Sequence, residues 1–245
     1  MRIGIFGGTY NPIHLGHTAL ASYICNLGLV DEVWLMVSPQ NPFKQDHQLL
    51  DEAVRLRLAT LAVQDFPRLR ASDFEFHLPR PSYTYVTLQE LTRTCPDDTF
   101  SLIIGADNWE KFPGWRNADD ILARYPLIVY PRETVNDERL AVSDGHMRET
   151  VNDERLAVSN GAATNAPPSL TGFCPPITGE PKGVQRPLRV GGGSPIFLSS
   201  APLYPISSTA IRDAIAAGED VSLWLDPAVY DLIRHLGLYR QTTSR

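Results

Sequence analysis

Cysteine, long apolar runs and excess positive charge are all scarce in this sequence. The three cysteines are an odd number without Cys-x-x-Cys spacing, which argues against a disulfide framework or a zinc knot. The longest apolar runs, such as residues 125–130, fall far short of the roughly 20 residues that a membrane helix needs. The first residues, MRIGIFGG, lack the basic region, long apolar segment and cleavage site of a signal peptide. We therefore expect a cytoplasmic protein without a membrane span.

The charge of the chain is negative, with 28 acidic and 22 basic residues and a net charge of −6 at pH 7. Such a chain has no general affinity for nucleic acid, so a bound anion must be captured by a local site. The 245 residues, 43% of them hydrophobic, suffice for one good-sized core, or for one core and a small accessory lobe. We expect a globular protein that binds its ligands in loops and does not bind nucleic acid.

Residues 1–131 alternate short apolar segments with longer segments of helical periodicity. The pattern predicts strands at 2–6, 33–37, 99–105 and 126–130, with helices at 17–27, at 52–63 and from Ser82 onward. This alternation is typical of a parallel sheet, so we expect a Rossmann-like, doubly wound α/β fold. After residue 195 the sequence predicts another strand, PIFLSS, and a helical C-terminal part. Its last helix has a start signal at Asp226–Pro227 and a stop signal at Gly237.

The composition of the sequence changes at residues 132–195, between the predicted α/β part and the helical C-terminal part. Residues 132–143, RETVNDERLAVS, occur again unchanged at 148–159, a 16-residue repeat that is too short and too polar for a solenoid. Residues 160–195 hold seven prolines and seven glycines, a composition typical of disordered chain. We predict a single domain over residues 1–245, interrupted at 132–195 by a flexible surface insertion. Deleting residues 133–195 and rejoining the ends with a short turn should then leave activity intact.

The strongest motif, GGTYNPIHLGH at residues 7–17, directly follows the first predicted strand. A doubly wound sheet opens its ligand crevice there, outside the carboxyl ends of its strands. Gly7 and Gly8 let a phosphate approach the main chain, and the helix that follows offers N–H groups to an anion. His14 and His17, three residues apart, lie on one face of the predicted helix start and can donate to the same phosphates. The motif differs from G-x-G-x-x-G and from the P-loop pattern, which disfavours a dehydrogenase and a P-loop kinase.

Residues 14–17, His-Leu-Gly-His, resemble the HxGH motif of a nucleotidyltransferase superfamily. Four further stretches narrow the resemblance to nicotinate-nucleotide adenylyltransferase, namely SPQNPFK at 38–44, SYTYVTL at 82–88, IIGADNWEKFPGW at 103–115 and ISSTAIR at 206–212. The resemblance covers residues 1–131 and 196–240. It implies transfer of the AMP part of ATP to nicotinate mononucleotide, which gives nicotinate adenine dinucleotide and pyrophosphate in NAD biosynthesis.

Alternatives of two classes stay open on the sequence. Within the superfamily, the chain could act on nicotinamide mononucleotide, or be a pantetheine-phosphate or glycerol-phosphate relative. A non-catalytic nucleotide sensor could also keep this fold, with the polar repeat as a docking arm. A class I tRNA synthetase fragment is disfavoured, because the acidic chain lacks a basic surface and a long anticodon-binding region. The sequence leaves the oligomeric state open, a homo-oligomer included.

The resemblance assigns the residues that hold ATP. The implied ATP site consists of Gly7, Gly8, Thr9, His14, His17, Ile206, Ser207, Ser208, Thr209 and Arg212. The implied catalytic residues are His14, His17, Lys44 and Arg212, which would neutralise charge on the phosphates in the transition state. Phe43 stands where many family members have a histidine, so a contact made by that histidine is lost or replaced.

The second substrate, nicotinate mononucleotide, would be bound by Lys44, Thr84, Asp107, Trp115 and Arg116. The resemblance implies that Thr84 and the main chain near Trp115 and Arg116 hold the nicotinate carboxylate, while the Trp115 ring stacks on the pyridine. We expect Mg²⁺ to enter with ATP, because the sequence offers no dedicated carboxylate cage. The mononucleotide phosphate is itself the nucleophile and is largely dianionic at neutral pH, so no protein base is required.

Other polar residues are given no role in the reaction. His77 and His235 have no partners at ligand spacing and are interpreted as non-catalytic. Arg55 and Arg57 are interpreted as the polar side of a helix.

Overall fold

The structure, a computed structural model, describes residues 1–39, 49–131, 195–198, 201 and 206–240. These residues belong to one compact unit, to which chain before and after the predicted insertion contributes. The insertion, apart from Pro195, lies outside the described residues, so its flexibility stays a prediction. Lys44 lies outside them as well.

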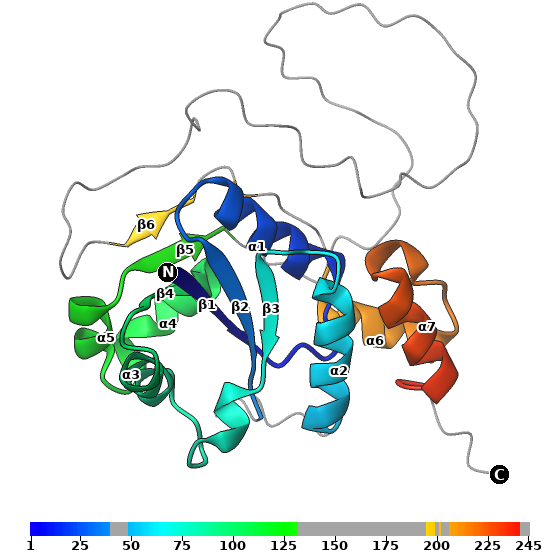
Figure 1. The fold of residues 1–245 in the computed structure, drawn as a ribbon. Helices are drawn as coiled ribbons and strands as arrows, with labels where there is room; N and C mark the ends of the chain where they lie inside the picture. The colour runs from blue at the N-terminus through cyan, green and yellow to red at the C-terminus, as the bar shows by residue number, and fades with distance from the viewer. Residues whose placement is uncertain (40–48, 132–194, 199–200, 202–205, 241–245) are drawn as a thin grey trace, which may run out of the picture. The chain divides into compact units, whose positions relative to one another are not determined.

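A parallel sheet forms the centre of this unit (Figure 1). Within the described residues it has six strands in the order β3-β2-β1-β4-β5-β6, and each neighbouring pair is parallel. The strands are β1 (Arg2–Gly8), β2 (Glu32–Val37), β3 (Leu69–Ser72), β4 (Thr99–Gly105), β5 (Leu127–Tyr130) and β6 (Ile196–Phe197). The predicted doubly wound, Rossmann-like sheet is confirmed.

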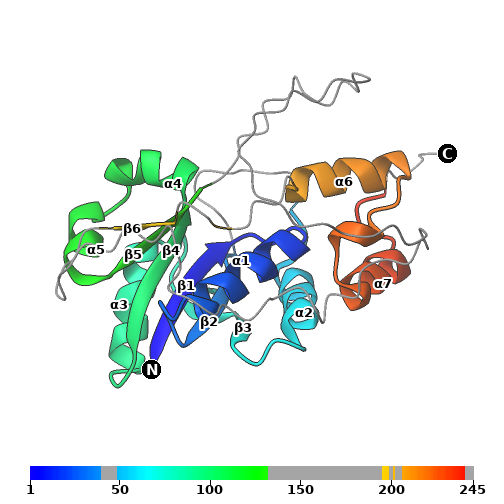
Figure 2. The same cartoon turned by 90° about the horizontal axis from the view of Figure 1, so that it is seen from above.

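Helices cover both faces of the sheet, as the view from above shows (Figure 2). One hydrophobic cluster joins α1 (Leu15–Asn26), α2 (Glu52–Val63), α6 (Ser208–Ala217) and α7 (Pro227–Leu236). A second cluster holds α3 (Thr84–Thr94) and α5 (Ala118–Arg124), close to the short α4 (Ala106–Lys111). Short 3-10 turns lie at η1 (Phe74–His77), η2 (Phe112–Gly114) and η4 (Ser222–Trp224). The predicted helical C-terminal part is α6 and α7, which lie together on the side away from α5 (Figure 1).

The central strands bury side chains on both faces, which explains their continuous apolar sequences. In β1, Ile3 and Ile5 belong to the cluster of α3 and α5, whereas Phe6 belongs to the cluster of α1 and α2. This division follows from the two-residue period of a strand, which directs successive side chains to opposite faces. The core therefore has two layers, with the sheet between them.

The direction in which the chain adds strands reverses between β1 and β4. From β1 the chain moves outward through β2 to β3, and then crosses to the other side of β1 to form β4 and β5. In doubly wound sheets such a reversal separates the loops at the carboxyl ends of the two central strands and opens a ligand site. The loops after Gly8 and Gly105 therefore flank the expected site.

Helix boundaries largely follow the sequence signals. α2 spans the predicted residues and begins after Asp51, whose side chain accepts a hydrogen bond from the amide of Ala53. α7 ends as predicted at Gly237, which has a left-handed backbone with φ of 62°. The helix predicted from Ser82 begins two residues later, at Thr84. Local capping residues thus mark both ends of α6 and α7 and the start of α2.

The interpretation of Arg55 as part of the polar side of α2 is wrong. Its side chain is 1% exposed, because it faces main-chain carbonyl groups of neighbouring loops, whereas Arg57 is exposed as predicted. No helix in the described ranges is long and apolar enough to span a membrane.

Candidate active site

The turn between β1 and α1 packs the ring of Tyr10 against His17. Tyr10 has a left-handed backbone, with φ of 47°, and its side chain is 2% exposed. The Tyr10 ring meets the His17 ring edge-on, with centroids 5.0 Å apart. A Cβ atom at Gly8 would lie 3.1 Å from the Tyr10 ring, so a side chain there would press on the ring. The turn thus supports His17 with a buried aromatic ring.

His14 and His17 lie side by side at the start of α1, as their spacing predicts. His14 is the N-cap residue, and the two ring centroids are 3.8 Å apart. The amide of His14 donates to Nδ1 of His17 over 3.2 Å, so the proton of a neutral His17 ring must sit on Nε2. Nε2–H can then donate to an anion at the start of the helix, where the His17 amide already donates to the carbonyl of His14 over 2.9 Å.

A second helix N-terminus adjoins the same turn. Ser207 caps α6 by accepting from the amide of Ala210, and the hydroxyl of Ser208 donates to the carbonyl of Pro12 over 2.9 Å. Arg212, one turn into α6, donates through Nη1 to the carbonyl of Asn11 over 2.9 Å. Residues 196 positions apart in the chain therefore meet just before the histidine pair.

The structure brings the described part of the predicted ATP site together. Gly7, Gly8 and Thr9 follow one another at the end of β1, and residues 206–212 form the start of α6. Both helix N-termini carry partial positive charge and amide donors, which suits a polyphosphate. Since Lys44 is outside the described residues, its part in this site stays a prediction.

The start of α3 and the segment after α4 form a second group of predicted residues. Thr84 is the first residue of α3, and Tyr83 is its N-cap. The guanidinium of Arg116 lies over the Tyr83 ring, 4.8 Å from its centroid. Trp115 is half-buried and packs against Phe112, with ring centroids 5.4 Å apart. Thr84, Trp115 and Arg116 thus come from two segments that touch.

Asp107 lies just after the end of β4, where the strand order reverses. It is the second residue of α4, whose N-cap is Gly105 at the end of β4. A Cβ atom at Gly105 would lie 2.5 Å from Oδ1 of Asp107 and 3.3 Å from the ring of Tyr130. The absence of a side chain at Gly105 therefore lets the Asp107 carboxylate fold back toward the end of the strand.

The sequence interpretation missed Glu75, a buried carboxylate next to this second group. Glu75 lies in η1, is 7% exposed, and accepts from Thr87 Oγ1 over 2.8 Å and from Ser82 Oγ over 3.4 Å. Burial raises its pKa, while the hydroxyls of Ser38, Thr87 and Ser82 oppose that rise. These bonds connect the end of β2 with the start of α3. The position of Glu75 between two phenylalanines was a signal of burial.

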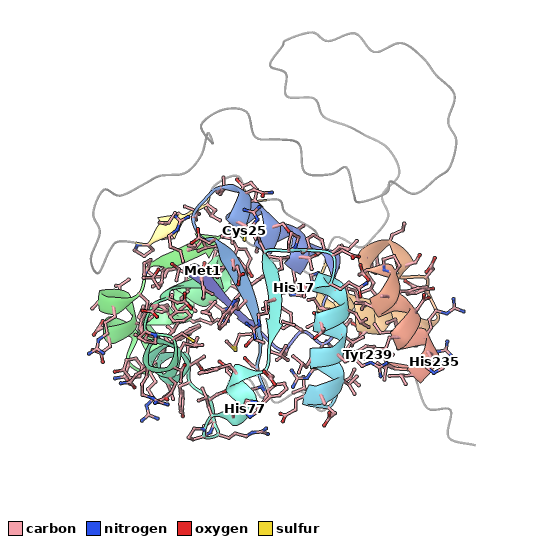
Figure 3. The ribbon with its side chains drawn as sticks, viewed as in Figure 1. Met1, His17, Cys25, His77, His235 and Tyr239 are labelled. Carbon is pink, nitrogen blue, oxygen red and sulfur yellow. The ribbon has the colours of Figure 1, made fainter. Side chains whose placement is uncertain are left out.

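Asn11 and Tyr239 were also missed. Asn11 is 2% exposed, and its Oδ1 accepts from the Tyr239 hydroxyl over 2.9 Å and from the amide of Leu50 over 3.3 Å. Burial raises the pKa of Tyr239, which keeps its hydroxyl protonated and a donor. Figure 3 shows Tyr239 close to α2. The C-terminal segment therefore holds the turn that precedes His14, across 228 positions that no sequence pattern links.

The remaining predicted features are simple to place. His77 and His235 lie apart from His17 (Figure 3). Among the described residues, no cluster of three or more His, Cys, Asp or Glu side chains could hold a metal ion. The donors at the site are imidazoles, hydroxyls, a guanidinium and amides, all of which suit anionic phosphates better than a bare cation.

Comparison with known proteins gives a consistent result. A family model of cytidylyltransferase-like proteins matches residues 5–214. The chain is 37% identical over 232 residues to a probable nicotinate-nucleotide adenylyltransferase from Bacteroides fragilis, covering 95% of this chain and 90% of that one. Its identity to the protein of the same name from Bacteroides thetaiotaomicron is 38% over 234 residues, covering 96% and 91%. Among solved structures, Plasmodium falciparum nicotinic acid mononucleotide adenylyltransferase complexed with NaAD has a similar fold, with a TM-score of 0.62 at 17% identity over 97% of each chain.

Proposed function

Because the chain belongs to the cytidylyltransferase-like family and, within it, to the nicotinate-nucleotide adenylyltransferases, we propose which of its residues carry out the reaction of that family. The enzyme transfers the adenylyl group of ATP to nicotinate mononucleotide, in NAD biosynthesis. The products are nicotinate adenine dinucleotide and pyrophosphate. The attacking phosphate oxygen forms a bond to the α-phosphorus of ATP as the bond to the pyrophosphate oxygen breaks.

The single observation that carries the proposal is the histidine pair between two helix N-termini. His14 and His17 are stacked at the start of α1, and the start of α6 is bonded to the same turn through Ser208 and Arg212. We assign the ATP phosphates to this place, where amide, imidazole and guanidinium donors converge. Such fixed donors stabilise charge that develops in the transition state, because they need no reorganisation as the reaction proceeds.

We assign nicotinate mononucleotide to the group formed by Thr84, Asp107, Trp115 and Arg116. Trp115 offers a half-buried aromatic face for the pyridine ring. The start of α3 at Thr84 supplies a hydroxyl, amides and a positive dipole end, which favour a carboxylate over a neutral amide. This arrangement supports nicotinate as the substrate over nicotinamide.

Adenylyl transfer then depends on positioning the two substrates and neutralising the charge of their phosphates, and it needs no protein base. A phosphate monoester has its second pKa near about 6, so the mononucleotide is a competent nucleophile at neutral pH. We propose that Mg²⁺ enters as the complex with ATP, bound by phosphates and water, and that Lys44 adds further positive charge. A cytoplasmic location also stays a prediction from the sequence.

The test is pyrophosphate release with ATP and Mg²⁺, comparing nicotinate and nicotinamide mononucleotide for the wild type, His17→Asn and His77→Asn. Asparagine keeps an acceptor for the amide of His14 but removes the Nε2 donor, so His17→Asn should lower kcat by about 10² to 10³. His77→Asn, at an exposed position of η1, should stay within about twofold of wild type. A His17→Asn variant that kept wild-type kcat would contradict the role of the histidine pair. A wild type that preferred the amide would contradict the assignment at Thr84.

A further inference from the structure

Arg55 is a buried cation whose guanidinium is spread over four main-chain carbonyl groups. Nη1 donates to the carbonyls of Thr9 and Ser38, both over 2.7 Å. Nη2 donates to the carbonyl of Pro39 over 3.1 Å, and Nε donates to that of Leu50 over 2.9 Å. The side chain is 1% exposed and is among the largest fully buried side chains among the described residues.

Burying the Arg55 guanidinium costs free energy, because the charged group loses its contact with water. Burial lowers the pKa of Arg55, and across the described ranges no carboxylate forms an ion pair with it. Buried ionic groups contribute little net stability compared with well-packed apolar side chains of similar volume. Stability alone is therefore a weak reason for an arginine at this position, whereas a rigid fork with several donors is a good reason.

Three of the four carbonyl groups, those of Thr9, Ser38 and Pro39, lie where the sheet stops providing its own hydrogen bonds, and the fourth, of Leu50, lies just before α2. β1 ends at Gly8 and β2 ends at Val37, and the last bond between them runs from the amide of Ser38 to the carbonyl of Gly8 over 2.9 Å. Beyond this bond, Arg55 joins the two chain segments through the carbonyls of Thr9 and Ser38. It thereby continues the connection between the strands into their loops.

The segments after β1 and β2 both lead to parts of the proposed site. Thr9 leads directly into the turn that presents the histidine pair, and Leu50, which Arg55 also holds, donates its amide to Asn11 in the same turn. On the other side, the hydroxyl of Ser38 contributes to the hydrogen bonds of Glu75, which lead to the start of α3. Arg55 therefore contacts the turn on the ATP side directly, and it contacts Ser38, whose hydroxyl begins the hydrogen bonds that lead to the start of α3.

We propose that Arg55 is a positioning residue for adenylyl transfer, one that fixes the turn after β1 against the start of the loop after β2. This inference rests on the proposed function, because it takes the turn after β1 to be the place of the ATP phosphates. Arg55 acts through Thr9, Ser38 and Leu50 and does not touch the reacting atoms. A displacement of about 1 Å at reacting groups lowers a rate by up to about 10², which sets the expected effect.

The experiment compares Arg55→Lys and Arg55→Met with the matched variants Arg57→Lys and Arg57→Met, two residues along the same helix on its exposed side. Lysine keeps the charge but its single nitrogen cannot span four acceptors, and methionine keeps much of the volume without donors. For each variant, urea unfolding gives the folded fraction, and kcat is expressed per folded molecule. The affinity for ATP is measured separately by calorimetry without the second substrate.

The proposal expects both Arg55 variants to lower kcat per folded molecule by about 100-fold and to weaken ATP binding by about 10-fold. The Arg57 variants should stay within about twofold of wild type. A purely structural role would lower the free energy of unfolding and leave kcat per folded molecule unchanged. A folded Arg55 variant with kcat within twofold of its Arg57 control, or failure of both Arg55 variants to fold, would overturn the proposal. If the wild type binds ATP but releases no pyrophosphate, the proposed function fails, and the ATP affinities still decide the role of Arg55.

Discussion

Replacing Thr87 by valine tests the buried carboxylate beside the mononucleotide group. Thr87 is 1% exposed on α3, and its hydroxyl donates to Glu75 Oε1 over 2.8 Å. Valine has nearly the same shape, so the substitution removes one hydrogen bond and leaves the packing almost unchanged. After the change, Glu75 keeps only the hydroxyls of Ser82 and Ser38 as donors among its described partners.

The size of the effect follows from the kind of bond that is lost. A hydrogen bond to a charged group contributes about 1.5–3 kcal/mol net, and one between neutral groups contributes about 0.5–1.5 kcal/mol. We therefore expect Thr87→Val to lower the free energy of unfolding by about 2 kcal/mol. For a chain of this size, that corresponds to a Tm lower by about 4–8 °C. Since Thr84 is one turn away on α3, KM for nicotinate mononucleotide should rise while KM for ATP stays unchanged.

The assay is urea unfolding followed by circular dichroism at neutral pH, together with steady-state kinetics on both substrates. The matched control is Thr60→Val on α2, where an exposed hydroxyl donates to the carbonyl of Leu56 over 2.9 Å. This control should change the free energy of unfolding by no more than about 0.5 kcal/mol. Equal stability of the Thr87 and Thr60 variants, with KM for the mononucleotide unchanged, would refute the reasoning.

Three further predictions concern other parts of the site. Burial raises the pKa of Glu75 above the value of about 4.3 in an unfolded chain, so the folded state binds the proton more tightly. The stability that wild type has relative to Glu75→Gln should therefore be greatest below about pH 4.3 and should fall as pH rises through the folded pKa, in urea unfolding at a series of pH values. Tyr239→Phe should lower the free energy of unfolding by about 1 kcal/mol and raise KM for ATP, because Asn11 loses one donor. Gly105→Ala should raise KM for nicotinate mononucleotide, because its Cβ would lie 2.5 Å from Asp107 Oδ1.

The chain supplies matched controls for two of these changes. Tyr230→Phe removes an exposed bond to Asp220, so it should affect stability less than the change at Tyr239. Gly114→Ala adds a Cβ with nothing within 4 Å, so kinetics should match wild type. A Gly105→Ala variant that behaved like Gly114→Ala would mean that Asp107 does not contact the substrate.

How much could be predicted from the sequence depends on the range of the interactions. The ends of α2 and α7 depend on capping residues a few positions away, and these were predicted well. The contact between His14 and His17 also follows from helical spacing alone. β3, with the sequence LRAS, was missed because a short and half-polar edge strand has no clear apolar pattern.

The buried polar residues could not be predicted, because tertiary partners decide their burial. Arg55 is bonded to carbonyl groups from 5 to 46 positions away, and the buried Asn11 is bonded to Tyr239 at 228 positions. An arginine in a helix is usually exposed, so the residue type predicts exposure even at a position that loops from several strands cover. Sequence reasoning therefore found the residues suited to substrates but not the residues that hold their loops.

The pairing of β5 with β6 limits how far the connection between these two strands can be shortened. The two strands are parallel neighbours, so a connection from Tyr130 to Ile196 has to span the length of a strand in the reverse direction. Such a return needs about a dozen residues or more, and the short turn suggested by the sequence would not allow the pairing. Removing one copy of the repeat is different, because shortening a 65-residue connection by 16 residues changes its closure entropy by only about 0.3 kcal/mol. For the flexible insertion that the sequence predicts, such copies can be gained or lost at almost no thermodynamic cost, whereas a connection of about a dozen residues or more must be kept.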